Sequence, residues 1–383
     1  MRHHHDHTLI RDIDVFDHTY LPEYFNHRDA QLQELAYLID PALRGGTPGN
    51  AILRGPPGTG KTTTVRRVFA EIEKTPLTRS ACELIPVYIN CRQSHTLIAV
   101  YRCIAQRLLG YPSPSRYLEE IRDGIAAHLS ERNATLLICL DDANYLIAAG
   151  IYNPLLYHLF RLYERWDDVR GAGVFAVTSD LRQNLCAEAD GAVQSVFRPT
   201  EISFLPYTTA EIREILGYRV HQGLYPGVMP AGVLDLAARL TADARDIRMG
   251  IDLVRAAATR AGKEGRSRVT RRDVLDVVAG VKSPVLAARA AALSSGERAL
   301  LYQLAEQSLA GDTMMAGAIF EEAQEYIAVG KTTYHTRLRR LADAGIIDLL
   351  WTRKGHEVFL RYSPDEVFAA CARAGGLTSS KIP

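Results

Sequence analysis

The clearest chemical signal in the chain is a run of eight residues, GPPGTGKT, at positions 55–62. It matches the pattern G-x-x-x-x-G-K-[ST], in which glycines let backbone N–H groups turn inward around phosphates. Lys61 supplies a point charge for the β- and γ-phosphates, and the Thr62 hydroxyl is suited to binding Mg²⁺. The pattern therefore predicts an ATP or GTP site, and its predicted contact residues are Pro57, Gly58, Thr59, Gly60, Lys61, Thr62 and Thr63.

A second signal is an apolar stretch, Leu136–Leu140, that ends in two carboxylates. In nucleotide hydrolases a strand of this kind carries one carboxylate toward Mg²⁺, while a further group orients the attacking water. We predict that Asp141, with Thr62, lies on the metal side and that Asp142 is the candidate base. The alternative interpretation of this acidic pair is a helix N-cap.

These motifs need strands and helices to position them, and short apolar runs alternate with helical patterns between residues 51 and 206. Such alternation predicts βαβ units, and hence a parallel sheet flanked by helices. An amphipathic helix is predicted before them at 28–43. The five predicted strands are Ala51–Arg54, Leu84–Asn90, Leu136–Leu140, Val174–Thr178 and Glu201–Phe204.

Beyond residue 208 the pattern changes, and helical segments follow one another without strands until about residue 344. The last three of these helices precede two short strands joined by a turn, which is the order of elements in a winged helix. The predicted domains are an α/β core at 1–207, a helical domain at 208–283 and a winged helix at 290–377.

One helix of the predicted winged helix, at 331–344, has an apolar side and a polar side. Hydroxyl and arginine side chains on the polar side suit a recognition helix in a major groove, and the basic turn after it suits contact with phosphates. Between 331 and 361 the chain carries seven basic and three acidic side chains. The predicted DNA-binding residues are Thr332, Thr336, Arg339, Arg340, Arg353 and Lys354. The alternative interpretation is a solvated surface or a protein-binding surface.

The overall composition excludes a membrane-spanning protein, because no apolar run approaches the roughly 20 residues that a bilayer requires. The hydrophobic fraction of 47% and charged fraction of 23% are typical of globular proteins. The amino terminus lacks the apolar stretch of a secretory signal, and the six cysteines show no CxxC pairing. We therefore expect a cytoplasmic protein with reduced thiols.

Over nearly its full length the chain resembles the archaeal replication-initiator AAA+ family, which comprises relatives of the origin recognition complex subunits and of cell division control protein six. The segments that carry the resemblance are Ile10–Asp12, Leu21–Pro22, His27–Arg28, Asn90–Arg92, Phe204–Tyr207 and Asp243–Arg248.

The resemblance implies an α/β P-loop AAA+ core with a parallel sheet, an all-α lid and a C-terminal winged helix. It implies ATP or ADP as the nucleotide, with His27–Arg28 in a box beside the adenine and Tyr207 and Arg219 at the nucleotide. It further implies that Arg245 reaches the γ-phosphate as a sensor. The implied role is recognition of origin sites on double-stranded DNA and recruitment of the replicative helicase, by a protein that is monomeric in solution or assembles on DNA.

Three positions depart from the family's usual pattern. Asp142 stands where AAA+ enzymes usually carry Glu, and Ser179 stands where the family usually has Asn. Ala192 replaces an Arg that is a candidate arginine finger. With Asp142, Ser179 and Arg245 as the predicted catalytic residues, we expect a slow ATPase that serves as a switch. The alternative is a nucleotide-responsive DNA-binding regulator, an initiator paralogue with a degraded ATPase site.

Overall fold

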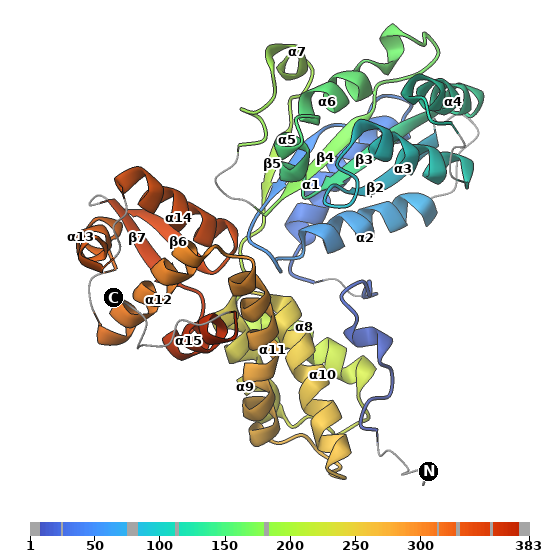
Figure 1. The fold of residues 1–383 in the computed structure, drawn as a ribbon. Helices are drawn as coiled ribbons and strands as arrows, with labels where there is room; N and C mark the ends of the chain where they lie inside the picture. Colours follow the sequence, from blue (N-terminus) through green and yellow to red (C-terminus); the bar gives the residue numbers. More distant parts are fainter. Residues whose placement is uncertain are drawn as a thin grey trace. The chain divides into compact units, whose positions relative to one another are not determined.

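The computed structural model of the chain describes residues 8–374 apart from seven short segments, and it divides into two compact units (Figure 1). The core unit contains residues 18–211 and 245–247, and the second unit contains the described parts of 1–17, 212–244 and 248–383. Each unit has its own buried hydrophobic core. The segments outside the described residues are 24–25, 75–82, 112–114, 180–183, 312–313, 327–329 and 353–354.

The core unit is built on a five-stranded sheet with the strand order β2-β3-β4-β1-β5. Every neighbouring pair of strands is parallel, which confirms the predicted parallel sheet. Each of the five predicted strands coincides with or overlaps an observed one. The strands are β1 (Ala51–Arg54), β2 (Glu83–Asn90), β3 (Ala134–Asp141), β4 (Gly173–Thr178) and β5 (Thr200–Ser203).

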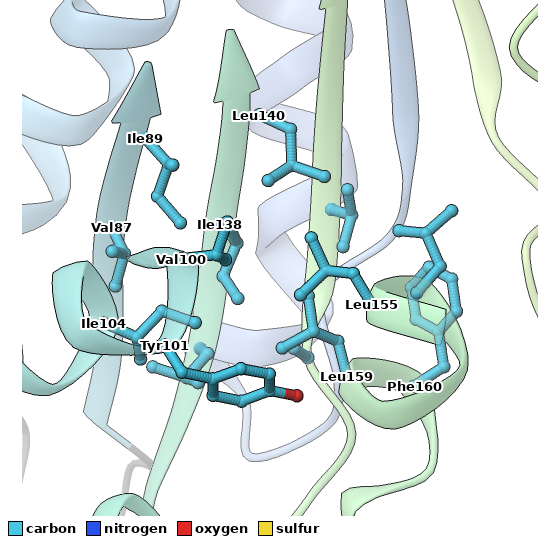
Figure 2. Close-up of a cluster of buried hydrophobic side chains, with 14 of the residues drawn as sticks. Val87, Ile89, Val100, Tyr101, Ile104, Ile138, Leu140, Leu155, Leu159 and Phe160 are labelled. Atoms are coloured by element: carbon cyan, nitrogen blue, oxygen red, sulfur yellow. The ribbon is translucent and has the colours of Figure 1, made fainter. Parts of the chain in front are cut away.

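Helices cover both faces of this sheet, so strand residues are buried whichever way they point. On β1, Leu53 packs in a cluster with α1 and α2, whereas Ile52 packs in a cluster with α3, α4 and α6. Figure 2 shows the second cluster, in which Val87 and Ile138 of the sheet lie beside Ile104 and other apolar residues of the helices. Burial on two faces explains the near-continuous apolar runs in the sequence. The helices of the core unit are α1 (Asp29–Leu43), α2 (Lys61–Lys74), α3 (Leu97–Leu109), α4 (Leu118–Glu131), α5 (Asn144–Ala148), α6 (Tyr152–Phe160), η2 (Leu162–Glu164) and α7 (Gly191–Gln194).

The second unit begins with four long helices and also holds the N-terminal segment of the chain. Phe16 is fully buried and packs against Gly223, and a side chain at position 223 would overlap the Phe16 ring. The guanidinium of Arg11 donates to carbonyl groups in the last turn of α8. Residues 8–17 therefore pack on α8, although the predicted core domain included them. The elements are η1 (Asp14–Phe16), α8 (Thr209–Gly223), α9 (Ala231–Ala244), α10 (Ile247–Lys263) and α11 (Arg271–Ala291).

The rest of the second unit is three helices, an antiparallel hairpin and a final helix. The order of helices and hairpin is the one predicted, but α11 is continuous through the predicted break at 284–289, and α15 was not predicted. Among the described residues, the structure contains no helix with the length and apolar character needed to cross a membrane. The elements are α12 (Ser295–Ala310), α13 (Ala316–Tyr326), α14 (Lys331–Asp343), β6 (Ile347–Thr352), β7 (Gly355–Leu360) and α15 (Pro364–Arg373).

Candidate nucleotide site and DNA-facing helix

The predicted phosphate loop connects the end of β1 to the start of α2. Gly58 and Gly60 have φ angles of 73° and 89°, a backbone conformation that side chains other than glycine rarely adopt. A side chain at Gly55 would overlap the carbonyl of Phe204, so this position also requires glycine. The loop thus has the backbone geometry that the sequence pattern predicts, with α2 directing its N-terminus at the site.

Lys61, the first residue of α2, is buried beneath this loop. Its Nζ lies 2.6 Å from the carbonyl oxygen of Gly55 and 2.8 Å from that of Pro56. The ammonium therefore donates to carbonyl groups of the phosphate loop. Bound phosphates, to which Lys61 is predicted to donate, would be stronger acceptors because they are charged. Thr59 supports the same loop, because its hydroxyl donates to the Pro56 carbonyl at 2.9 Å.

Thr62 and Asp141, the two predicted Mg²⁺ residues, are in direct contact. The Thr62 hydroxyl donates to Asp141 Oδ2 at 2.8 Å, and the Tyr88 hydroxyl donates to the same oxygen at 2.6 Å. Burial, and then the Asp141 carboxylate, raise the pKa of Tyr88 far above its usual value, so its hydroxyl remains a donor. A hydroxyl and a carboxylate oxygen are the kind of ligands that Mg²⁺ takes, so Thr62 and Asp141 would suit this ion. The described part of the chain has no cluster of three or more His, Cys, Asp or Glu side chains that could hold a metal ion.

Asp142, the candidate base, is engaged in an ion pair. Its Oδ2 lies 3.1 Å from Nε of Arg92, whose guanidinium stacks 5.0 Å from the ring centroid of Tyr145. Ser179 follows β4, the strand between β3 and β1, and is half-buried. The sheet order therefore brings Asp142 and Ser179 to the same edge as the phosphate loop, because the carboxyl ends of parallel strands lie together.

Arg245 lies in the turn between α9 and α10, in a segment that belongs to the core unit. It is exposed and has a φ of 53°, which is uncommon for a residue with a side chain. The next residue, Asp246, packs so closely on Gly58 that a Cβ there would overlap its carboxylate. The turn that carries the predicted sensor therefore lies against the phosphate loop.

Tyr207 and Arg219, which were also predicted to lie at the nucleotide, belong to different units of the structure. Tyr207 is buried in the core unit, and the guanidinium of Arg28 stacks 3.9 Å from its ring centroid. Arg219 is buried in the second unit, where it donates to the carbonyl of Val15 at 2.6 Å. Sequence reasoning gave Arg28 no role at the phosphate loop, because nothing in its local pattern indicates burial.

The predicted DNA-binding helix is α14, and its two sides are as the helical wheel predicts. Tyr334, Leu338 and Leu341 are buried, whereas Thr332, Thr336 and Arg339 are exposed. Sequence reasoning missed His335 on the exposed side. Burial, and then the positive charges of Lys331, His356 and Arg339, lower the pKa of His335. The predicted wing residues Arg353 and Lys354 lie outside the described residues.

Arg340 has an interaction within the fold that the sequence did not predict. Its Nη1 lies 2.9 Å from Oε1 of Glu297, a buried carboxylate that forms the capping box of α12 with Ser294. The neighbouring basic side chain of Arg337 contacts Gly296 at the start of α12. These two arginines of α14 therefore approach α12, although 65% of the Arg340 side chain remains exposed, and Arg339 is exposed as well.

Glu297 makes the stability of the second unit depend on pH. Burial opposes its ionisation, but the Ser294 N–H and Arg340 outweigh burial, so its pKa lies below the ordinary 4.5. A lowered folded-state pKa stabilises the fold above pH 4.5, and this contribution is lost as pH falls further. We expect the stability advantage of the wild type over Glu297→Gln to shrink on acidification from pH 6 to 4, measured by chemical unfolding. An advantage that is constant over this range would contradict the assignment.

The match of this chain with known families covers most of its length. A protein-family model for the AAA ATPase domain matches residues 24–307. ORC1-type DNA replication protein 6 of Halobacterium salinarum is 36% identical over 349 residues, which cover 91% of this chain and 90% of that protein. ORC1-type DNA replication protein 2 of Methanosarcina acetivorans is 35% identical, with 91% of each chain covered.

Solved structures also resemble this chain over nearly all of its length. The Aeropyrum pernix ORC1 protein, solved in complex with DNA, has a TM-score of 0.66 at 27% identity and covers 95% of this chain and 96% of its own. The Aeropyrum pernix ORC2 protein has a TM-score of 0.76 at 23% identity, with 96% and 98% covered, a likeness of fold alone. Both agree with the predicted fold class.

Proposed function

Because the chain belongs to the family of ORC1-type DNA replication proteins, with an AAA ATPase domain over residues 24–307, we propose that it is an ATP-dependent initiator that binds origin DNA. The observation that carries this proposal is the joint presence of two parts. The first is the phosphate loop with Lys61 and the contact between Thr62 and Asp141. The second is α14, whose exposed side carries Thr332, Thr336 and Arg339.

Each residue of the nucleotide site has a role in this proposal. The N–H groups of the loop and Lys61 would bind the phosphates, and Thr62 and Asp141 would hold Mg²⁺. The ion would neutralise the charge of the phosphates to which it binds. Ser179 orients the attacking water, and Arg245 responds to the γ-phosphate. Because Arg245 lies in the turn between α9 and α10, the state of the nucleotide would bias the conformation of that turn.

We further propose that hydrolysis is slow, because Asp142 is one methylene shorter than the usual Glu and is paired with Arg92. A carboxylate whose negative charge is offset by a neighbouring guanidinium polarises an attacking water less than an unpaired carboxylate does. Ala192, in α7, adds to this argument because the candidate arginine finger is absent at that position. ATP would then act mainly as a switch between DNA-binding states.

The ion pair leads to a testable result for Arg92→Ala. We expect this change to raise the single-turnover rate of ATP hydrolysis by about threefold to tenfold, because it frees the Asp142 carboxylate; a factor of ten corresponds to about 1.4 kcal/mol of barrier. Arg132→Ala, which removes a surface ion pair with Glu83 in the same unit, is the matched control and should leave the rate unchanged. A lower rate in Arg92→Ala would mean that Arg92 assists hydrolysis.

DNA binding is tested directly with duplexes from the source genome. We expect the protein with Mg²⁺ and ATP to bind a duplex from a replication start at least about tenfold more tightly than a promoter duplex of equal length. Fluorescence anisotropy at several salt concentrations measures both affinities, because phosphate contacts make binding salt-dependent. Equal affinity for the two duplexes would contradict an origin-binding function.

The second candidate function is a nucleotide-responsive DNA-binding regulator. The Asp142–Arg92 pair and the residues at 179 and 192 favour it, since a regulator needs nucleotide binding but not turnover. Tighter binding to the promoter duplex would support this function. Recruitment of the replicative helicase belongs to the initiator proposal alone, and a pull-down of the helicase by the DNA-bound protein tests it.

A further inference from the structure

The guanidinium of Arg28 is buried beside the phosphate loop and bonds to three carbonyl groups. Nε donates to Thr59 O at 3.0 Å, Nη2 donates to Leu205 O at 2.7 Å, and Nη1 donates to His27 O at 3.3 Å. The ring of Tyr207 stacks on the guanidinium. Only 5% of Arg28 is exposed. Arg28 therefore connects the N-terminus of α1 to two segments that lie 31 and 177 residues further along the chain.

The hydrogen bonds of Arg28 bring it no negative charge, since each acceptor is a neutral carbonyl. The carboxylate of Glu211 acts on Arg28 electrostatically, but its ion-pair contact is with the imidazole of His27, 3.9 Å away. A buried cation that is not directly paired costs folding energy. A triphosphate bound in the adjacent loop would add negative charge near Arg28.

The bond to Thr59 also fixes the orientation of a peptide group. The peptide between Thr59 and Gly60 is planar, and its C=O and N–H point in opposite directions. Because the carbonyl of Thr59 accepts a hydrogen bond from Arg28, the N–H of Gly60 points away from Arg28, and we infer that it faces the interior of the loop. Gly60 has a φ of 89° that permits this orientation. Inward N–H groups are what a phosphate loop needs.

We propose that Arg28 is a positioning residue for the triphosphate: it holds the Thr59 peptide so that Gly60 N–H faces the phosphates, and it ties this loop to the Leu205 segment. The proposal rests on the proposed nucleotide site. Lysine cannot replace arginine here, because one ammonium lacks the planar fork that reaches Thr59 and Leu205 together while stacking on Tyr207.

The test compares Arg28→Lys with the wild type for three ligands: ATP, ADP and adenosine. Each competes with a fluorescent ATP analogue in the presence of Mg²⁺, which gives dissociation constants even for weak binding. We expect ATP and ADP to bind about tenfold or more weakly to Arg28→Lys, because charged hydrogen bonds that orient the loop are lost. Adenosine, which has no phosphates, should change less than about twofold.

Two control variants test whether the effect is specific to Arg28 or results from replacing any exposed or buried arginine. Arg44→Lys changes an exposed arginine at the other end of α1, and Arg122→Lys changes a buried arginine of the core unit that pairs with Glu119. Neither should alter the ratio of ATP to adenosine affinity. If Arg28→Lys does not fold, Tyr207→Leu, which removes only the stacked ring, should weaken ATP and ADP binding relative to adenosine.

The outcomes are distinct. Unchanged ATP affinity in Arg28→Lys would overturn the proposal, and equal loss for all three ligands would show that Arg28 supports the adenosine pocket or the fold instead. If Arg28→Lys does not fold, an equal loss of affinity for ATP, ADP and adenosine in Tyr207→Leu would overturn the proposal. If the wild type itself fails to bind ATP, the proposed function fails before the role of Arg28 is at issue.

Discussion

Replacing Lys61 by alanine is expected to weaken ATP binding by roughly 30- to 150-fold. The ammonium of Lys61 lies at the loop with its Nζ 2.6 Å from Gly55 O, and phosphates are the charged acceptors for which this group is placed. Hydrogen bonds to charged groups contribute about 2–3 kcal/mol, which gives the expected range of affinity. Titration calorimetry with Mg²⁺ and ATP measures the change.

The same helix supplies the control for this experiment. Lys74→Ala removes an exposed lysine at the last turn of α2, where it pairs with Glu71 on the surface, and should leave ATP affinity unchanged. Melting of both variants without nucleotide shows whether either change unfolds the core unit. Wild-type affinity in Lys61→Ala, with a folded protein, would contradict the assignment of the loop.

The second large effect separates two adjacent arginines of α14. We expect Arg339→Ala to weaken binding of duplex DNA by about tenfold to a hundredfold, since one good base contact contributes about 1–3 kcal/mol. Arg339 is exposed on the same side as Thr332 and Thr336. Fluorescence anisotropy at constant salt measures the loss, and it should occur without a change in protein stability.

Arg340→Ala should behave in the opposite way. Removing Arg340 leaves the buried carboxylate of Glu297 without its guanidinium partner. Because 65% of the Arg340 side chain is exposed and solvent screens the pair, we expect the free energy of unfolding to fall by about 0.5–1 kcal/mol. DNA affinity of the folded protein should change by less than about threefold. If Arg340→Ala weakens DNA binding as much as Arg339→Ala does, both arginines contact DNA, as the sequence first predicted.

Much of the fold could be predicted from the sequence because its patterns are local. Apolar runs such as Leu136–Leu140 are buried on both faces and therefore read clearly as strands. The amphipathic pattern of α14 similarly predicted its buried side. The predicted break at 284–289, between the predicted helical domain and the predicted winged helix, was wrong, because α11 continues through Pro284 and the Ala-rich stretch beyond it.

The site could be predicted only where its residues form a contiguous motif. The phosphate loop and Asp141 belong to such motifs, and the contact of Thr62 with Asp141 is consistent with the carboxyl ends of parallel strands lying at one edge of the sheet. Contacts that depend on tertiary packing leave no trace in the sequence. The bond of Arg28 to Thr59 and the pair of Arg92 with Asp142 are of this kind.

Genome-wide occupancy of the native protein, measured by crosslinking and sequencing beside a Lys61→Ala strain, tests the central claim most directly. An ATP-dependent initiator predicts a few sharp peaks at replication starts that weaken or vanish in the Lys61→Ala strain. Peaks at promoters, or peaks at replication starts that do not respond to Lys61→Ala, would contradict it. The first of these results would favour the regulator, and the second would separate DNA binding from the nucleotide site.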